Sequence, residues 1–201
     1  MPRSTIEFWF DFASTYSYVS LMRADELIVT SGLRVKYMPF LLGPIFRAQG
    51  WDSSPFNVYP AKGKYMWRDM ERLCARYGLP LKRPDTFPPF ALLATRVALA
   101  AREEGFLAAY CKAVFHAEYG LGRDITDKQL IAAILEQVGA DPVRWLEKAG
   151  EEATKQALKD RVDAAQAKGI FGAPTFITPD GELFWGNDRL EQALEWVLRR
   201  R

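Results

Sequence analysis

The sequence predicts an α/β protein in which a large helical segment interrupts the strand-forming part of the chain. Strand-like segments occur only near the two ends of the 201 residues, within 6–40 and 173–185. From about residue 41 to 169, apolar side chains recur at the spacing of amphipathic helices. With roughly 150 residues per domain, this length suits one large domain or a small domain carrying an insertion.

Residues 6–11 (IEFWFD) are aromatic and apolar, which is typical of a buried strand, and the small residues 13–15 end it. Helical periodicity follows over 16–31, and Gly32 is suited to the C′ position of that helix. Residues 33–40 then alternate apolar with charged side chains, as a strand does. The chain therefore opens with a βαβ unit.

Helices are expected throughout the middle of the chain. Apolar stripes cover 66–77 and 106–117, each opposite a polar face. Thr126, with Gln129 three residues later, predicts a capping box that begins a further helix. A proline at the start of 142–168 predicts one long polar helix over that range.

Strand character returns at 173–178 (APTFIT), and Pro179-Asp180-Gly181 predicts the turn of a hairpin whose second strand is 182–185. A last amphipathic helix covers 190–197. The order β-α-β, helices, β-β-α is that of a thioredoxin-like fold, although periodicity leaves other α/β arrangements open. We place the thioredoxin-like domain at 1–44 and 169–201, and the inserted helical domain at 45–168.

Composition excludes several classes of function. Lys and Arg number 27 against 25 Asp and Glu, a net charge of +2, and no basic stripe suggests a nucleic-acid partner. Cys74 and Cys111 form no C-x-x-C pair, so we expect neither a metal site nor dithiol chemistry. No apolar run approaches the ~20 residues of a membrane span, and no signal-peptide pattern opens the chain, so we expect a cytoplasmic protein.

The first candidate site lies where the first strand ends and the first helix begins. Ser14, Tyr16 and Ser17 fall at this point, where free backbone N–H groups and the helix dipole stabilise anions. A thiolate there has a lowered pKa, and a serine hydroxyl can donate a hydrogen bond to it. An ordinary N-cap explains a serine at this position equally well.

Two later loops carry further candidates. Pro174, preceded by Ala173, opens a strand; a cis peptide bond there turns the backbone of the preceding residue toward a ligand, whereas a trans bond suits an edge strand. Asn187 and Asp188 precede the last helix, and Asp188 with Glu191 also matches an N-cap arrangement.

Four segments link these loops: FDFASTYSY, YPAKGKYMWRDMERL, GIFGAPTFIT and FWGNDRL. Together they resemble the 2-hydroxychromene-2-carboxylate isomerase family, which is related to kappa-class glutathione transferases and to DsbA-like disulfide oxidoreductases. The resemblance spans essentially the whole chain. It implies a DsbA-like thioredoxin domain with a helical insertion, a homodimer, and one glutathione bound per subunit.

The resemblance also implies roles for individual residues. Ser14 matches the catalytic serine that stabilises the glutathione thiolate, and Ser17 falls where the disulfide oxidoreductases have their second cysteine, so dithiol redox activity is not expected. Lys62 matches a lysine that reaches the ligand. The other glutathione-binding positions are Ala173 and the cis-proline Pro174, at the cysteinyl backbone, and Asn187 and Asp188, near the γ-glutamyl end.

The implied reaction interconverts 2-hydroxychromene-2-carboxylate and trans-o-hydroxybenzylidenepyruvate, or a related aromatic acid, by reversible addition of the glutathione thiolate. A cation such as Lys62 or an arginine would meet the substrate carboxylate. Two alternatives remain: a kappa-like glutathione transferase acting on an electrophilic substrate, and a noncatalytic thioredoxin-like binding module.

The chain departs from the family pattern at several positions. Thr15 replaces the usual proline at the helix start. Trp51 and Phe90 stand where asparagines are common, and they predict a more aromatic cleft. Asn57 is then the candidate for the polar contact that Trp51 cannot make.

Overall fold

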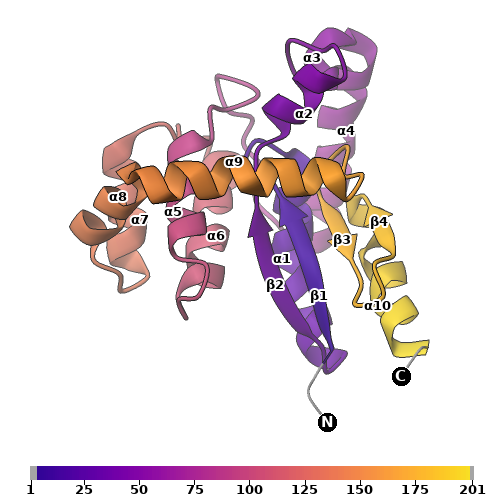
Figure 1. Cartoon of the computed structure of the whole chain (residues 1–201). Helices are drawn as coiled ribbons and strands as arrows, with labels where there is room; N and C mark the ends of the chain where they lie inside the picture. Colours follow the sequence, from indigo (N-terminus) through magenta and orange to yellow (C-terminus); the bar gives the residue numbers. More distant parts are fainter. Residues whose placement is uncertain (1–3, 200–201) are drawn as a thin grey trace.

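The computed structural model describes residues 4–199 and contains a four-stranded mixed sheet in the order β2-β1-β3-β4 (Figure 1). Helix α1 (Thr15–Thr30) connects β1 (Thr5–Phe10) to β2 (Arg34–Pro39), which lies parallel to β1. Strand β3 (Thr175–Ile177) pairs antiparallel with β1, and β4 (Leu183–Trp185) pairs antiparallel with β3. The predicted α/β fold, with its opening βαβ unit and closing hairpin, is confirmed.

Helices cover both faces of the sheet because side chains alternate along β1. Phe8 and Phe10 are fully buried in the core that contains residues of α1 and α10 (Leu190–Arg199). Trp9 is fully buried on the opposite face, in a smaller core with residues of α9 (Glu152–Ala167). Figure 1 shows α9 lying across the sheet. The sheet is therefore the middle of three layers.

Eight helical elements separate β2 from α9, as the helical periodicity predicted. Figure 1 shows α2, α3 and α4 gathered beyond one end of the sheet, and α5 to α8 beside it. Whether they form a separate domain at 45–168 stays a prediction. Within residues 4–199, no helix is both long and apolar enough to cross a membrane. The elements are α2 (Leu42–Ala48), α3 (Pro55–Val58), α4 (Pro60–Tyr77), α5 (Leu92–Ala100), α6 (Leu107–Phe115), the π-helix η1 (His116–Gly120), α7 (Lys128–Gln137) and α8 (Pro142–Gly150).

The predicted capping box at α7 is wrong. Asp127, not Thr126, is the N-cap, because its carboxylate accepts a hydrogen bond from the Gln129 N–H at 2.8 Å. The Thr126 hydroxyl instead donates to Asp124 at 2.6 Å. A local turn closed by Asp124 therefore displaces the helix start by one residue.

The single long helix predicted over 142–168 is divided in two. Helix α8 ends at Gly150, and Glu151 is extended, with φ −63° and ψ 146°, before α9 begins. Helix α8 packs against α5 and α7, whereas α9 packs against α2 as well as α5. The chain must change direction between these two packing partners, and Gly150 costs little at such a break.

The π-helix η1 holds a buried carboxyl group. Glu118 is only 1% exposed, and its Oε2 accepts a hydrogen bond of 3.4 Å from the Ile125 N–H. Its Oε1 has no hydrogen-bond partner among the described residues. Burial, assisted by the charge of Asp124, raises the pKa of Glu118 from 4.5 to about 7.

Glu118→Gln should stabilise the protein at neutral and alkaline pH. Because folding raises the pKa of Glu118, its protonated form contributes to stability below the unfolded-state value, and this contribution is lost as the pH rises through about 7. The variant should therefore exceed the wild type in free energy of unfolding by up to about 3 kcal/mol at about pH 8, and by almost nothing at about pH 4. Urea denaturation at both pH values measures this, and a pH-independent difference would contradict it.

Candidate functional site

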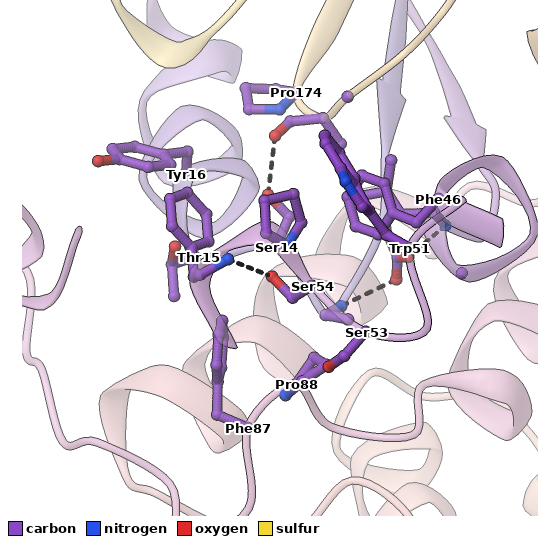
Figure 2. Close-up of a pocket in the computed structure, with 18 of the residues that line it drawn as sticks. Ser14, Thr15, Tyr16, Phe46, Trp51, Ser53, Ser54, Phe87, Pro88 and Pro174 are labelled. Carbon is purple, nitrogen blue, oxygen red and sulfur yellow. Dashed lines mark hydrogen bonds between the residues drawn. The ribbon is translucent and has the colours of Figure 1, made fainter. Parts of the chain in front are cut away.

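Ser14 lies in the turn between β1 and α1 and makes hydrogen bonds in two directions. Its Oγ accepts from the Ser17 N–H at 3.2 Å, which caps the first turn of α1. The same Oγ donates to the carbonyl oxygen of Ala173 at 2.9 Å (Figure 2). The N-cap interpretation is thus correct, and the serine also contacts the second predicted loop.

The Ala173–Pro174 peptide bond is cis, as the family resemblance implies. This peptide directly precedes β3, and the Pro174 carbonyl accepts a hydrogen bond from the Gly186 N–H at 2.9 Å. The loop is thereby held between β4 and the start of α1, with Ala173 next to Ser14.

A cavity of about 1250 Å³ opens at this end of the sheet. This exceeds the ~300–1,000 Å³ of most ligand pockets. Figure 2 shows Ser14 facing the Pro174 loop, with Trp51 and Phe46 to one side and Tyr16 and Phe87 to the other. The cavity wall includes all six residues predicted for the site: Ser14, Lys62, Ala173, Pro174, Asn187 and Asp188. Their roles toward a ligand stay predictions.

Aromatic side chains form much of the wall opposite Ser14. The Trp51 ring lies 5.8 Å from the Phe46 ring and 6.5 Å from the Tyr59 ring, centroid to centroid. At the mouth, Phe171 and Trp185 are partly exposed and their ring centroids lie 4.9 Å apart. The aromatic character expected from Trp51 is therefore present in the wall, whereas Phe90, also in the wall, is 70% exposed.

Two cations also line the cavity. The Lys62 Nζ lies 4.7 Å from the centroid of the Tyr59 ring, and Arg47 lies on α2. Among the described carboxylates, none pairs with either cation. A cation without a carboxylate partner suits an anionic group of a ligand, and the cavity wall also holds the carboxylates of Asp52, Asp69 and Asp188.

Asn187 is held rigidly behind the Ser14 turn. It is 5% exposed, and its Oδ1 accepts hydrogen bonds from the Ser20 hydroxyl at 3.0 Å and from the Arg23 guanidinium at 3.1 Å. Both donors lie on α1, so this helix fixes both Ser14 and Asn187.

The predicted N-cap of Asp188 with Glu191 is wrong. Asp188 lies in a short 3₁₀ helix (Asn187–Arg189) and its side chain makes no capping hydrogen bond. It contacts Arg189 at 2.9 Å, and Glu191 pairs with Arg23. The Asp188 carboxylate is largely exposed and remains accessible to a ligand.

Sequence patterns did not reveal Asp11, which lies under the Ser14 turn. It is 2% exposed and its carboxylate accepts hydrogen bonds from the Ala13 N–H at 2.9 Å and the Leu42 N–H at 2.7 Å. Burial raises the pKa of Asp11 from 3.8 to about 6, and the two hydrogen bonds oppose the rise. The only signal was an aspartate directly after an apolar strand.

The surroundings of three other side chains were not predicted from the sequence. The Tyr16 hydroxyl donates to Asp69 at 3.0 Å across the cavity wall, and burial together with the Asp69 charge raises the pKa of Tyr16. Asn57, the candidate for a polar ligand contact, is absent from the wall and donates to the Phe87 carbonyl at 2.9 Å instead. Ser17 is fully buried, and its hydroxyl has no hydrogen-bond partner among the described residues.

Fold and site define a thioredoxin-fold protein that has serines, Ser14 and Ser17, at the start of α1. The chain matches the DSBA-like thioredoxin domain family over residues 5–197, and it belongs to that family.

Known relatives span nearly the whole chain. It is 32% identical over 195 residues to a 2-hydroxychromene-2-carboxylate isomerase of Sphingobium xenophagum, covering 96% of this chain and 98% of that one. It is 28% identical over 204 residues to human glutathione S-transferase kappa 1, covering 95% and 89%. The solved structure of a 2-hydroxychromene-2-carboxylate isomerase superposes with a TM-score of 0.87 at 28% identity, covering 98% of this chain and 95% of that one.

Gly172→Ala should displace the Trp185 indole from the mouth of the cavity, because an added Cβ would lie 2.4 Å from the indole Nε1. Trp185 is 51% exposed, so its indole has room to shift toward solvent, and we expect a changed tryptophan emission spectrum with a loss of stability below about 1 kcal/mol. The change should be absent when the same substitution is made in a Trp185→Phe background. If the emission spectrum still changes in the Trp185→Phe background, displacement of Trp185 is not the cause.

Proposed function

We propose that this protein is a glutathione-dependent isomerase that interconverts 2-hydroxychromene-2-carboxylate and trans-o-hydroxybenzylidenepyruvate, or a closely related aromatic acid. One observation carries the proposal. The Ser14 hydroxyl lies at the start of α1 and 2.9 Å from the Ala173 carbonyl, within a cavity whose wall holds aromatic side chains together with cations and carboxylates.

The residues present fit glutathione. This tripeptide carries two carboxylates, one ammonium group and a thiol. The peptide at Ala173 offers its backbone to the cysteinyl residue, and Ser14 lies beside it for the thiol. Asp188 suits the ammonium group, and Lys62 and Arg47, which pair with no described carboxylate, suit the carboxylates of the ligand.

When bound, glutathione would supply a thiolate nucleophile that adds to the conjugated substrate, permits rotation about a carbon–carbon bond and is then eliminated. Ser14 would donate its hydroxyl hydrogen bond to the sulfur in place of Ala173. The N-terminus of α1 would stabilise the same negative charge. Together, these two contributions would keep the thiol ionised near neutral pH without a general base.

The aromatic wall would bind the ring of the substrate. Trp51 and Phe46 present faces and edges suited to a planar ring, which pairs with aromatic side chains at centroid distances of about 4.5–7 Å. The volume of about 1250 Å³ accommodates a second molecule beside the tripeptide. Of Arg47 and Lys62, the one that does not bind glutathione would meet the substrate carboxylate.

A glutathione transferase is the second candidate. The 28% identity to human glutathione S-transferase kappa 1 supports it, and so does the aromatic wall, which would accept apolar electrophiles. The two activities differ in whether the sulfur leaves the product again, and product analysis separates them.

Calorimetric titration with reduced glutathione tests the proposal first. We expect one molecule bound per subunit, with ultraviolet thiolate absorbance that reports a thiol pKa below that of free glutathione. Absence of binding would remove both glutathione-dependent functions and favour the noncatalytic module.

Ser14→Ala should raise the pKa of the bound thiol and lower turnover of 2-hydroxychromene-2-carboxylate by about 10- to 100-fold, because a hydrogen bond to a charged group contributes about 1.5–3 kcal/mol. Loss of the helix cap should also reduce stability by about 1 kcal/mol. Absorbance assays and thermal unfolding measure the two effects.

Ser17→Ala is the matched control for Ser14→Ala. The Ser17 hydroxyl lies one helical turn away, is buried and contacts no described partner, so its loss should leave both thiol pKa and turnover unchanged. Equal turnover in wild type and Ser14→Ala would exclude a catalytic role for Ser14.

A further inference from the structure

We infer that Asp11 is a positioning residue for this site: its ionised carboxylate ties the Ser14 turn to the first residue of α2 and so sets the gap between the serine and the aromatic wall. The role in catalysis rests on the proposed function, because it concerns the same site. The tie itself does not depend on any ligand.

The carboxylate of Asp11 joins two segments that no other described side chain joins here. One oxygen accepts from the Ala13 N–H at 2.9 Å, directly before Ser14, and the other accepts from the Leu42 N–H at 2.7 Å. The backbone carbonyl of Asp11 accepts from the Ser14 N–H, also at 2.9 Å. Asp11 therefore accepts three hydrogen bonds, two from the Ser14 turn and one from α2.

Leu42 begins the helix that carries the opposite wall. Helix α2 holds Phe46 and Arg47, and the Phe46 carbonyl accepts a 2.9 Å hydrogen bond from the Trp51 N–H. A shift of the Leu42 end of α2 would consequently move the aromatic ring and the cation relative to Ser14. A misplacement of about 1 Å at reacting groups can cost on the order of 100-fold in rate.

Only a carboxylate matches this pair of donors. An ionised Asp accepts at both oxygens, whereas an amide or a protonated acid presents a donor at one of them. The added donor would face the N–H group of either Ala13 or Leu42, and that N–H group would lose its hydrogen bond to residue 11. Because Asp11 is 2% exposed, water cannot readily replace it.

The surroundings of Asp11 make this tie sensitive to pH. Burial raises its pKa to about 6. Its titratable neighbour on η1 is Tyr119, which is fully buried and has a raised pKa, so it stays neutral. Helix α2 contributes Arg47 to the same cavity. The tie should therefore be complete above about pH 7 and weaken as the pH falls through 6.

The first test uses the wild-type protein without glutathione. A pH titration followed by amide nuclear magnetic resonance should move the Ala13 and Leu42 N–H signals together, with one midpoint near the pKa of Asp11, about 6. Signals that do not move, or that move with different midpoints, would overturn the inference. This test remains valid if a variant at Asp11 fails to fold.

The second test compares Asp11→Asn with the wild type for bound glutathione. If Asp11 positions the turn, the variant misaligns the Ser14 hydroxyl and raises the thiol pKa by about one unit, the equivalent of one weakened charge-assisted hydrogen bond. If Asp11 acts merely as a buried negative charge, its removal lowers the thiol pKa. A lowered or unchanged value would contradict the positioning role.

Asp160→Asn is the control, because Asp160 lies exposed on α9, outside the cavity, and contacts only Gln156 among the described hydrogen bonds. It should leave the thiol pKa at the wild-type value. If the wild type binds no glutathione while Ala13 and Leu42 still titrate together, the proposed function fails and the structural tie stands. If glutathione binds but the two amides do not titrate together, the tie fails alone.

Discussion

The antiparallel pairing of β1 with β3 is the constraint on which the site depends. It places Phe8 opposite Phe176, and these buried rings stack with centroids 5.0 Å apart. Ser14 and Ala173 are 159 positions apart in the chain, and each lies just beyond one end of this short ladder. A slip of one residue would turn Phe8 toward the wrong face, so burial of the core also fixes the distance between the two loops.

The large insertion closes the cavity that the sheet leaves open. Helices α2 to α4 lie beyond the end of the sheet where β1 meets α1, and α9 returns across the sheet to deliver the chain to β3. Trp9 and Ile177 pack with Val162 of α9 on this second face. The same apolar burial that covers the sheet therefore brings the aromatic wall opposite the serine.

Much of this arrangement followed from local sequence signals. Strands and turns are recognisable from residue type, and the motifs around Ser14 and Pro174 indicated loops that do meet in space. The break at Glu151, the cap at Asp127 and the pairing of Asp188 with Arg189 were missed, because each depends on which neighbours compete for the same backbone or charge. Asp11 was missed since its partner, Leu42, is supplied only by the folded chain.

The two walls of the cavity come from separate parts of the chain. The wall with Ser14 and Pro174 belongs to the sheet and its loops, whereas Trp51, Phe87 and Lys62 belong to the inserted segment. Substitutions in the inserted wall can consequently change the shape of the cavity while the wall that carries Ser14 and Pro174 stays the same. A change in which molecules the cavity accepts therefore needs no change in the sheet, and the core that holds the sheet together is left untouched.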